Sequence, residues 1–145
     1  MLRRTLLPAL SGLLATPALR SAAAQDRPLP PHGFLFGSWT GGIFPAIDTQ
    51  GSACFGAVTL IVAPDVVMRA SSLDVAFRQR LVETVALNPN GVEIRLAPIP
   101  GRAPSEAGFG CDGNPDLLRV VRRGEDEVVL QGCSDFPFPL RRCKG

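Results

Sequence analysis

The sequence predicts an all-β domain of about eight short antiparallel strands in a meander, closed as a small barrel, with a β-sandwich as the alternative. Valine-rich segments recur along the chain, and valine suits a pleated surface. Turn residues separate these segments at even spacing, which is typical of hairpins. Within residues 92–97, apolar and charged side chains alternate, as expected for a strand with one buried face.

The expected strands follow one another along the chain. They cover residues 36–44, 58–62, 66–70, 77–87, 92–97, 117–122, 127–131 and 140–144. The connections 63–65, 88–91 and 123–126 contain proline or glycine and predict tight turns. Residues 71–81 are also compatible with a helix, but their β-rich flanks favour a bent strand. The long connection 99–115 has the length of a functional or mobile loop.

Residues 1–24 have the order of a cleaved export signal: a short basic head, a mostly apolar stretch and small residues before the cut. The apolar stretch is too short for a membrane-spanning helix. We expect cleavage between Ala24 and Gln25, a periplasmic or secreted location, and an ordinary signal in preference to a twin-arginine one. Residues 25–33 then form a proline-rich tether and 34–145 a single domain.

Loss of the signal changes the charge balance. The full chain has 15 basic and 13 acidic residues, a net charge of +2. Arg3, Arg4 and Arg20 leave with the signal, so the remaining 121 residues carry 12 basic and 13 acidic side chains. Bulk charge therefore gives no reason to expect nucleic acid or an anionic membrane as a partner.

Four cysteines lie after the signal: Cys54, Cys111, Cys133 and Cys143. An even count in an exported chain predicts two disulfides, and the absence of a Cys-x-x-Cys pair argues against a metal site. Cys111 and Cys133 flank one expected hairpin, which favours the pairs Cys111–Cys133 and Cys54–Cys143. The rival pair is Cys133–Cys143, across the loop 136–139.

Few residues are suited to catalysis. His32, the only histidine, lies in the proline-rich tether, so no nucleophilic triad is expected. Residues 112–116 begin like a calcium loop, but Arg123 stands where that loop requires a glutamate. We therefore expect no catalytic residue, metal ion or cofactor, with a carboxylate-based hydrolase as a distant alternative.

Two polar residues are candidates for binding a ligand inside the barrel. By period two, Gln79 and Glu83 share a face with apolar side chains such as Phe77 and Leu81. If this face points inward, Gln79 and Glu83 would orient a ligand. A bulge or a bend would instead turn Glu83 towards solvent.

Gly37-Ser38-Trp39, on the first expected strand, resembles the Gly-x-Trp signature of lipocalin-like barrels. The resemblance implies that Trp39 closes one end of the barrel and that a basic residue near the last strand, Arg141 or Arg142, packs across it. Arg142 is the preferred partner. The superfamily includes carriers of small ligands, and periplasmic metalloprotease inhibitors have a similar small barrel. Trp39 can equally be a core anchor.

Phe109, Phe136 and Phe138 lie in connections rich in proline and glycine. Exposed aromatic residues of this kind are common interface anchors, although they can also fold back and cap the barrel. We therefore expect a binding protein with one of two partners. One is a small apolar molecule held at Gln79, Glu83 and Trp39, and the other is an exported protein contacted by the phenylalanine loops.

Overall fold

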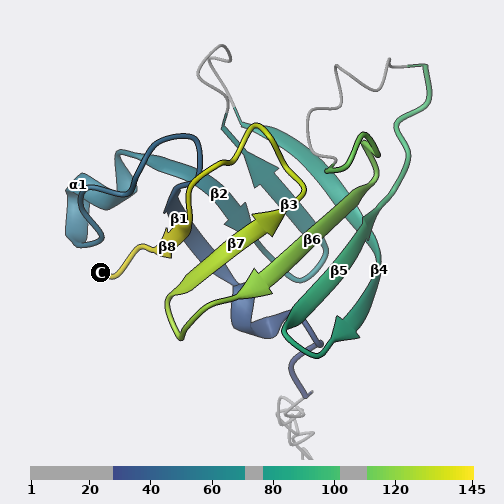
Figure 1. Ribbon diagram of the computed structural model, residues 1–145, viewed down its shortest axis with the longest axis horizontal. Helices are drawn as coiled ribbons and strands as arrows, with labels where there is room; N and C mark the ends of the chain where they lie inside the picture. Colours follow the sequence, from purple (N-terminus) through teal and green to yellow (C-terminus); the bar gives the residue numbers. More distant parts are fainter. Residues whose placement is uncertain (1–27, 71–76, 102–110) are drawn as a thin grey trace, which may run out of the picture.

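A computed structural model describes residues 28–70, 77–101 and 111–145 (Figure 1). Eight antiparallel strands pair in sequence order, and β8 pairs with β1 to close the barrel. The predicted all-β barrel and its meander are confirmed, and the sandwich alternative is wrong. The bounds are β1 (Gly37–Gly41), β2 (Val58–Val62), β3 (Val66–Arg69), β4 (Arg78–Asn88), β5 (Gly91–Leu96), β6 (Leu117–Arg122), β7 (Glu127–Gln131) and β8 (Leu140–Arg142).

Two short helical elements accompany the strands. A 3₁₀ turn, η1 (Gly33–Leu35), precedes β1, and α1 (Gly51–Phe55) lies between β1 and β2. Figure 1 shows α1 outside the barrel, on the side formed by β1, β2 and β8. The sequence analysis did not predict α1. Residues 71–76, where a helix was the alternative to a bent strand, lie outside the described residues.

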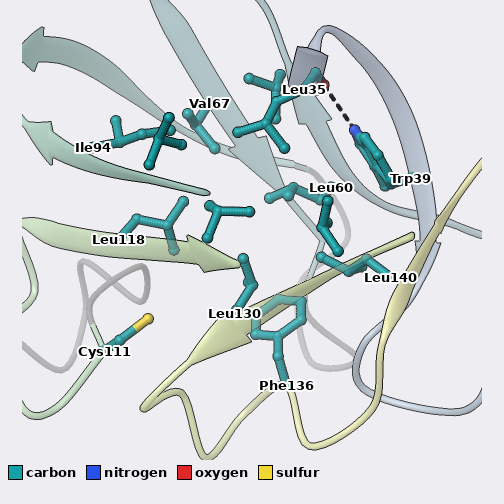
Figure 2. Close-up of a cluster of buried hydrophobic side chains, with 14 of the residues drawn as sticks. Leu35, Trp39, Leu60, Val67, Ile94, Cys111, Leu118, Leu130, Phe136 and Leu140 are labelled. Atoms are coloured by element: carbon teal, nitrogen blue, oxygen red, sulfur yellow. Dashed lines mark hydrogen bonds between the residues drawn. The ribbon is translucent and has the colours of Figure 1, made fainter. Parts of the chain in front are cut away.

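The inward side chains of the strands pack into one apolar cluster that fills the barrel (Figure 2). Each strand except β4 supplies at least one side chain that is fully buried within it, and β4 contributes the half-buried Val82 and Val85. The buried members are Leu35, Trp39, Leu60, Val62, Val67, Val92, Ile94, Leu96, Cys111, Leu118, Val120, Val128, Leu130, Phe136 and Leu140. Burial of this apolar surface is the main term that stabilises the fold.

The segment before β1 covers one end of the barrel. The indole N–H of Trp39 donates a hydrogen bond of 2.8 Å to the carbonyl of Leu35, drawn as a dashed line in Figure 2. His32, placed in the tether by the sequence analysis, is buried, and its Nε2 lies 3.0 Å from the carbonyl oxygen of Pro64. The last residues of the predicted tether are therefore packed against the barrel.

Two disulfides link elements that are distant in sequence. Cys54 of α1 is bonded to Cys143, with Cα atoms 5.6 Å apart, and Cys111 is bonded to Cys133, with Cα atoms 4.4 Å apart. The structure thus contains the pairing favoured from the sequence and not the rival Cys133–Cys143 pair. None of the helices in the described ranges is long and apolar enough to cross a membrane.

Candidate functional site

The interior of the barrel does not match the predicted ligand site. Gln79 and Glu83 are both exposed on the outside of β4, so the interpretation that they point inward is wrong and the alternative, a bulge that turns Glu83 towards solvent, is confirmed. Trp39 is fully buried, and its indole N–H is already bonded to Leu35, which leaves no surface for a ligand. The space that a carrier would need is occupied by the apolar core.

A bulge in β4 explains the error. Val82 pairs with Leu96 and Thr84 pairs with Arg95, so Glu83 has no partner on β5. The extra residue changes the inward phase of the strand, because Val82 points inward before the bulge and Val85 after it. The side chains that share a face by strict alternation over residues 77–87 therefore lie on opposite sides of the sheet before and after the bulge.

Two arginines, Arg69 of β3 and Arg80 of β4, stand opposite buried residues of the neighbouring strands and face the inside of the barrel. Arg69 and Arg80 are both buried. The guanidinium of Arg80 donates hydrogen bonds to the carbonyls of Pro115 and Ala97 and to the carboxylate of Asp116. Arg69 pairs with Asp135 at 3.3 Å and lies over the ring of Phe136, 5.0 Å from its centroid. These contacts neutralise the charges and make them part of the barrel wall.

Arg142 packs across Trp39, as the resemblance implied. Its guanidinium carbon lies 4.3 Å from the centroid of the tryptophan ring. The same guanidinium donates to the carbonyls of Phe34 and Phe36 and pairs with Asp126. This cluster ties β8 to the segment before β1 and has a structural role.

The three loop phenylalanines do not form one exposed group. Phe136 is only 3% exposed and packs beside Leu130 and Leu140 in the core, so its prediction as an interaction residue is wrong (Figure 2). Phe138, two residues later, is 38% exposed. Phe109 lies outside the described residues. Burial of Phe136 follows from its contact with Arg69 and from its position over the open end of the apolar core.

An apolar hollow lies on the outer face of the barrel, between α1 and the ends of β1 and β2. We call it the outer groove, and its volume is about 380 Å³. Its lining comprises Thr40, Gly41, Phe44, Pro45, Ile47, Asp48, Ala53, Ala57 and Thr59. Small residues form the floor, and large apolar side chains, Phe44 and Ile47, are exposed at the rim.

Two glycines direct the chain into this arrangement. Gly41 and Gly42 have φ angles of 95° and 77°, which favour glycine, and they turn the chain away from the sheet after β1. A Cβ on Gly41 would lie 2.7 Å from the carbonyl oxygen of Pro139, and one on Gly42 would meet the ring of Phe136. Both positions therefore require glycine for space as well as for conformation.

The far wall of the groove is fastened to the C-terminal segment. The disulfide Cys54–Cys143 joins α1 to the residue after β8. Main-chain hydrogen bonds run from Lys144 to Thr49 at 3.0 Å and from Gly51 to Lys144 at 2.8 Å. These links hold residues 49–54 at a fixed distance from β1 and β2, so the hollow is preformed.

The floor of the groove offers few free polar groups. The hydroxyl of Thr40 donates to the carbonyl of Ala57 at 2.8 Å, and that of Thr59 donates to the carbonyl of Gly41 at 2.9 Å. Their hydrogen-bond donors are therefore used within the fold. Such a surface favours apolar groups, because a polar ligand would lose hydrogen bonds to water without replacing them.

Sequence reasoning missed the outer groove. The segment Ile43-Phe44-Pro45-Ala46-Ile47 is apolar, follows two glycines and contains a proline, so it could have been read as an exposed apolar loop. Its wall depends on the pairing of Cys54 with Cys143 across the barrel surface. The sequence favoured this pair, but it did not predict α1, and so it could not show that a disulfide between residues 89 positions apart holds a helix beside β1 and β2.

Among the described residues, the titratable groups with shifted pKa values lie in ion pairs, and no cluster of metal ligands occurs. Across residues 28–70, 77–101 and 111–145, no three His, Cys, Asp or Glu side chains are grouped to hold a metal ion. Asp112, the first residue of the calcium-like segment, pairs with Arg119. The hydrogen bond that Arg119 donates to the carboxylate of Glu93 raises the pKa of Arg119, and the hydrogen bond that Asp126 accepts from Lys144 lowers the pKa of Asp126. Both shifts belong to surface ion pairs.

Comparison with protein families, with curated proteins and with solved structures finds no match to this chain.

Proposed function

We propose that the protein is an exported binding protein without enzymatic activity and that it holds an apolar ligand in the outer groove, outside the barrel. The observation that carries the proposal is a preformed apolar hollow of about 380 Å³. Its volume falls within the range of about 300–1,000 Å³ typical of small-ligand sites. Two disulfides suit work in an oxidising compartment.

Exposure of the rim supports the same conclusion. Phe44 is 69% exposed and Ile47 is fully exposed, although the adjoining wall is fastened by a disulfide. Burying one such side chain in a complex is worth about 1.5–3 kcal/mol. An exposed apolar rim beside an apolar floor is thus a surface that gains free energy when it is covered.

Binding of the neutral apolar dye Nile red to the oxidised protein tests the proposal. We expect Ile47→Ser to weaken binding by tenfold or more, the effect of about 1.4 kcal/mol, because the rim loses its most exposed apolar side chain. Ala53→Trp should fill the groove and abolish binding. Dye fluorescence and its concentration dependence are the measurements.

Two variants are matched controls away from the groove. Leu87 is 69% exposed, and Ala86 is exposed on β4, so Leu87→Ser and Ala86→Trp make the same chemical changes elsewhere. Both should bind the dye as the wild type does. The proposal is contradicted if Leu87→Ser and Ala86→Trp weaken dye binding while Ile47→Ser and Ala53→Trp leave it unchanged. It is also contradicted if the wild type does not bind the dye.

A further inference from the structure

The lining of the outer groove contains one charged residue, Asp48. Asp48 is exposed, and its Oδ1 accepts a hydrogen bond of 2.8 Å from the backbone N–H of Gln50, immediately before α1. The ion pairs formed among the described residues do not include Asp48. A carboxylate is therefore held in place at the margin of an apolar hollow.

The basic side chains of the C-terminal segment are paired with acidic residues other than Asp48. Lys144 lies opposite Gln50 in a β-bridge, but its ammonium group is bound to Asp126. Arg141 pairs with Glu127 at 3.0 Å. Arg142 lies over Trp39 and also contacts Asp126. Each of these cations is engaged elsewhere, so the groove presents a negative charge beside its apolar surface.

From this charge complementarity we propose that the outer groove binds a polypeptide segment in which a large apolar side chain stands next to a lysine or an arginine. The inference rests on the proposed function and specifies its ligand. The apolar side chain lies between Phe44, Ile47 and Ala53, and the cation faces Asp48. An anionic lipid surface fits the site less well, because its phosphates would meet the carboxylate.

Competition with Nile red tests the choice of ligand. The probes are three capped peptides of glycine and serine with one central phenylalanine, followed by lysine, glutamine or glutamate. We expect the lysine peptide to displace the dye at a two- to fivefold lower concentration than the glutamine peptide, which is about the effect of a partly exposed ion pair. The glutamate peptide should be the weakest, and the differences should shrink as salt is added.

Asp48→Asn removes the negative charge of Asp48 and keeps a side chain of the same shape. Asparagine keeps an oxygen that can accept the hydrogen bond from Gln50, so the start of α1 retains its local support. In this variant the affinities of the lysine and glutamine peptides should become equal. Glu125→Gln, which removes an exposed acidic charge from the β6–β7 turn, is the matched control and should keep the preference for lysine.

The outcomes separate the inference from the proposed function. Dye binding at the groove with equal displacement by all three peptides overturns the inference and leaves the groove as an apolar site. The inference is also overturned if no peptide displaces the dye. If the protein then sediments with phosphatidylglycerol vesicles and Ile47→Ser abolishes this sedimentation, the ligand is a lipid surface. Absence of dye binding contradicts the proposed function itself.

Discussion

Arg142 combines three kinds of interaction at the covered end of the barrel. It stacks on Trp39, donates to the carbonyls of Phe34 and Phe36, and pairs with Asp126. The carbonyls belong to the segment that covers the barrel, so this side chain joins the last strand to the start of the domain. The planar fork of a guanidinium is suited to two acceptors and an aromatic face at once, and an ammonium group is not.

We therefore expect substitutions of Arg142 to reduce the stability of the fold to different extents. We expect Arg142→Met to lower the free energy of unfolding by about 2–4 kcal/mol, because two carbonyls and Asp126 lose a charged donor. Arg142→Lys should recover only part of this loss. Urea unfolding followed by the fluorescence of Trp39, the only tryptophan, measures both values. Equal stability of the lysine variant and the wild type would show that the fork geometry has no role.

At the scale of elements, the β6–β7 turn and the C-terminal segment are joined by charge. The ammonium group of Lys144 and the guanidinium of Arg142 both contact the carboxylate of Asp126. The hydrogen bond from Lys144 and the two positive charges lower the pKa of Asp126. The same C-terminal segment carries Cys143 and pairs with Thr49, so this ion cluster also supports the wall of the outer groove.

The lowered pKa of Asp126 sets a pH dependence. A carboxyl group whose pKa is depressed in the folded state stabilises the fold above its unfolded pKa, about 4, and this stabilisation is lost as the pH falls further. We expect wild type to be more stable than Asp126→Asn by a constant amount from about pH 5 to pH 7, with the difference vanishing towards pH 2. Urea unfolding at several pH values measures this difference.

The neighbouring residue supplies the control for this titration. Glu125 lies in the same turn and is exposed, and no ion pair of the described residues includes it. Glu125→Gln should leave the dependence of stability on pH unchanged. A difference between wild type and Asp126→Asn that grows below pH 4 would contradict the role given to Asp126.

At the scale of the whole molecule, apolar side chains fill the interior of the barrel, and the outer groove lies outside it. The core runs from Trp39 and Leu35 at the covered end to Phe136 near the other (Figure 2). Arg69 and Arg80 line the wall beyond this apolar cluster and are paired with acidic residues. A ligand carried inside would have to displace this packed core, whereas the outer groove is already open.

Phe136 and Phe138 provide a test of this packing. Phe136→Ala should lower the free energy of unfolding by about 3–5 kcal/mol, because it leaves a cavity in the core. Phe138→Ala should change it by less than about 1 kcal/mol, since this side chain is already 38% exposed. Urea unfolding of the two variants measures the contrast. Similar losses for both would mean that Phe136 does not contribute to the core as described.

Most of the strands could be predicted, because their signals are local. Alternation from Val92 to Leu96 and the turns at 88–91 and 123–126 depend only on neighbouring residues. The candidate site could not be predicted in the same way. The alternation along β4 was compatible both with an inward Glu83 and with a bulge at this residue, and α1 is too short to show a helical period.

The sequence by itself determined the class of fold and the order of the strands, because apolar alternation and turn chemistry are local properties. Only the tertiary structure decided which side chains enter the barrel and where an apolar groove forms on its outer face. Arg80 can be buried because it forms an ion pair with Asp116, and the wall of the outer groove is held in place by the disulfide between Cys54 and Cys143. In each case the deciding partner is distant in sequence and becomes a neighbour only when the barrel closes.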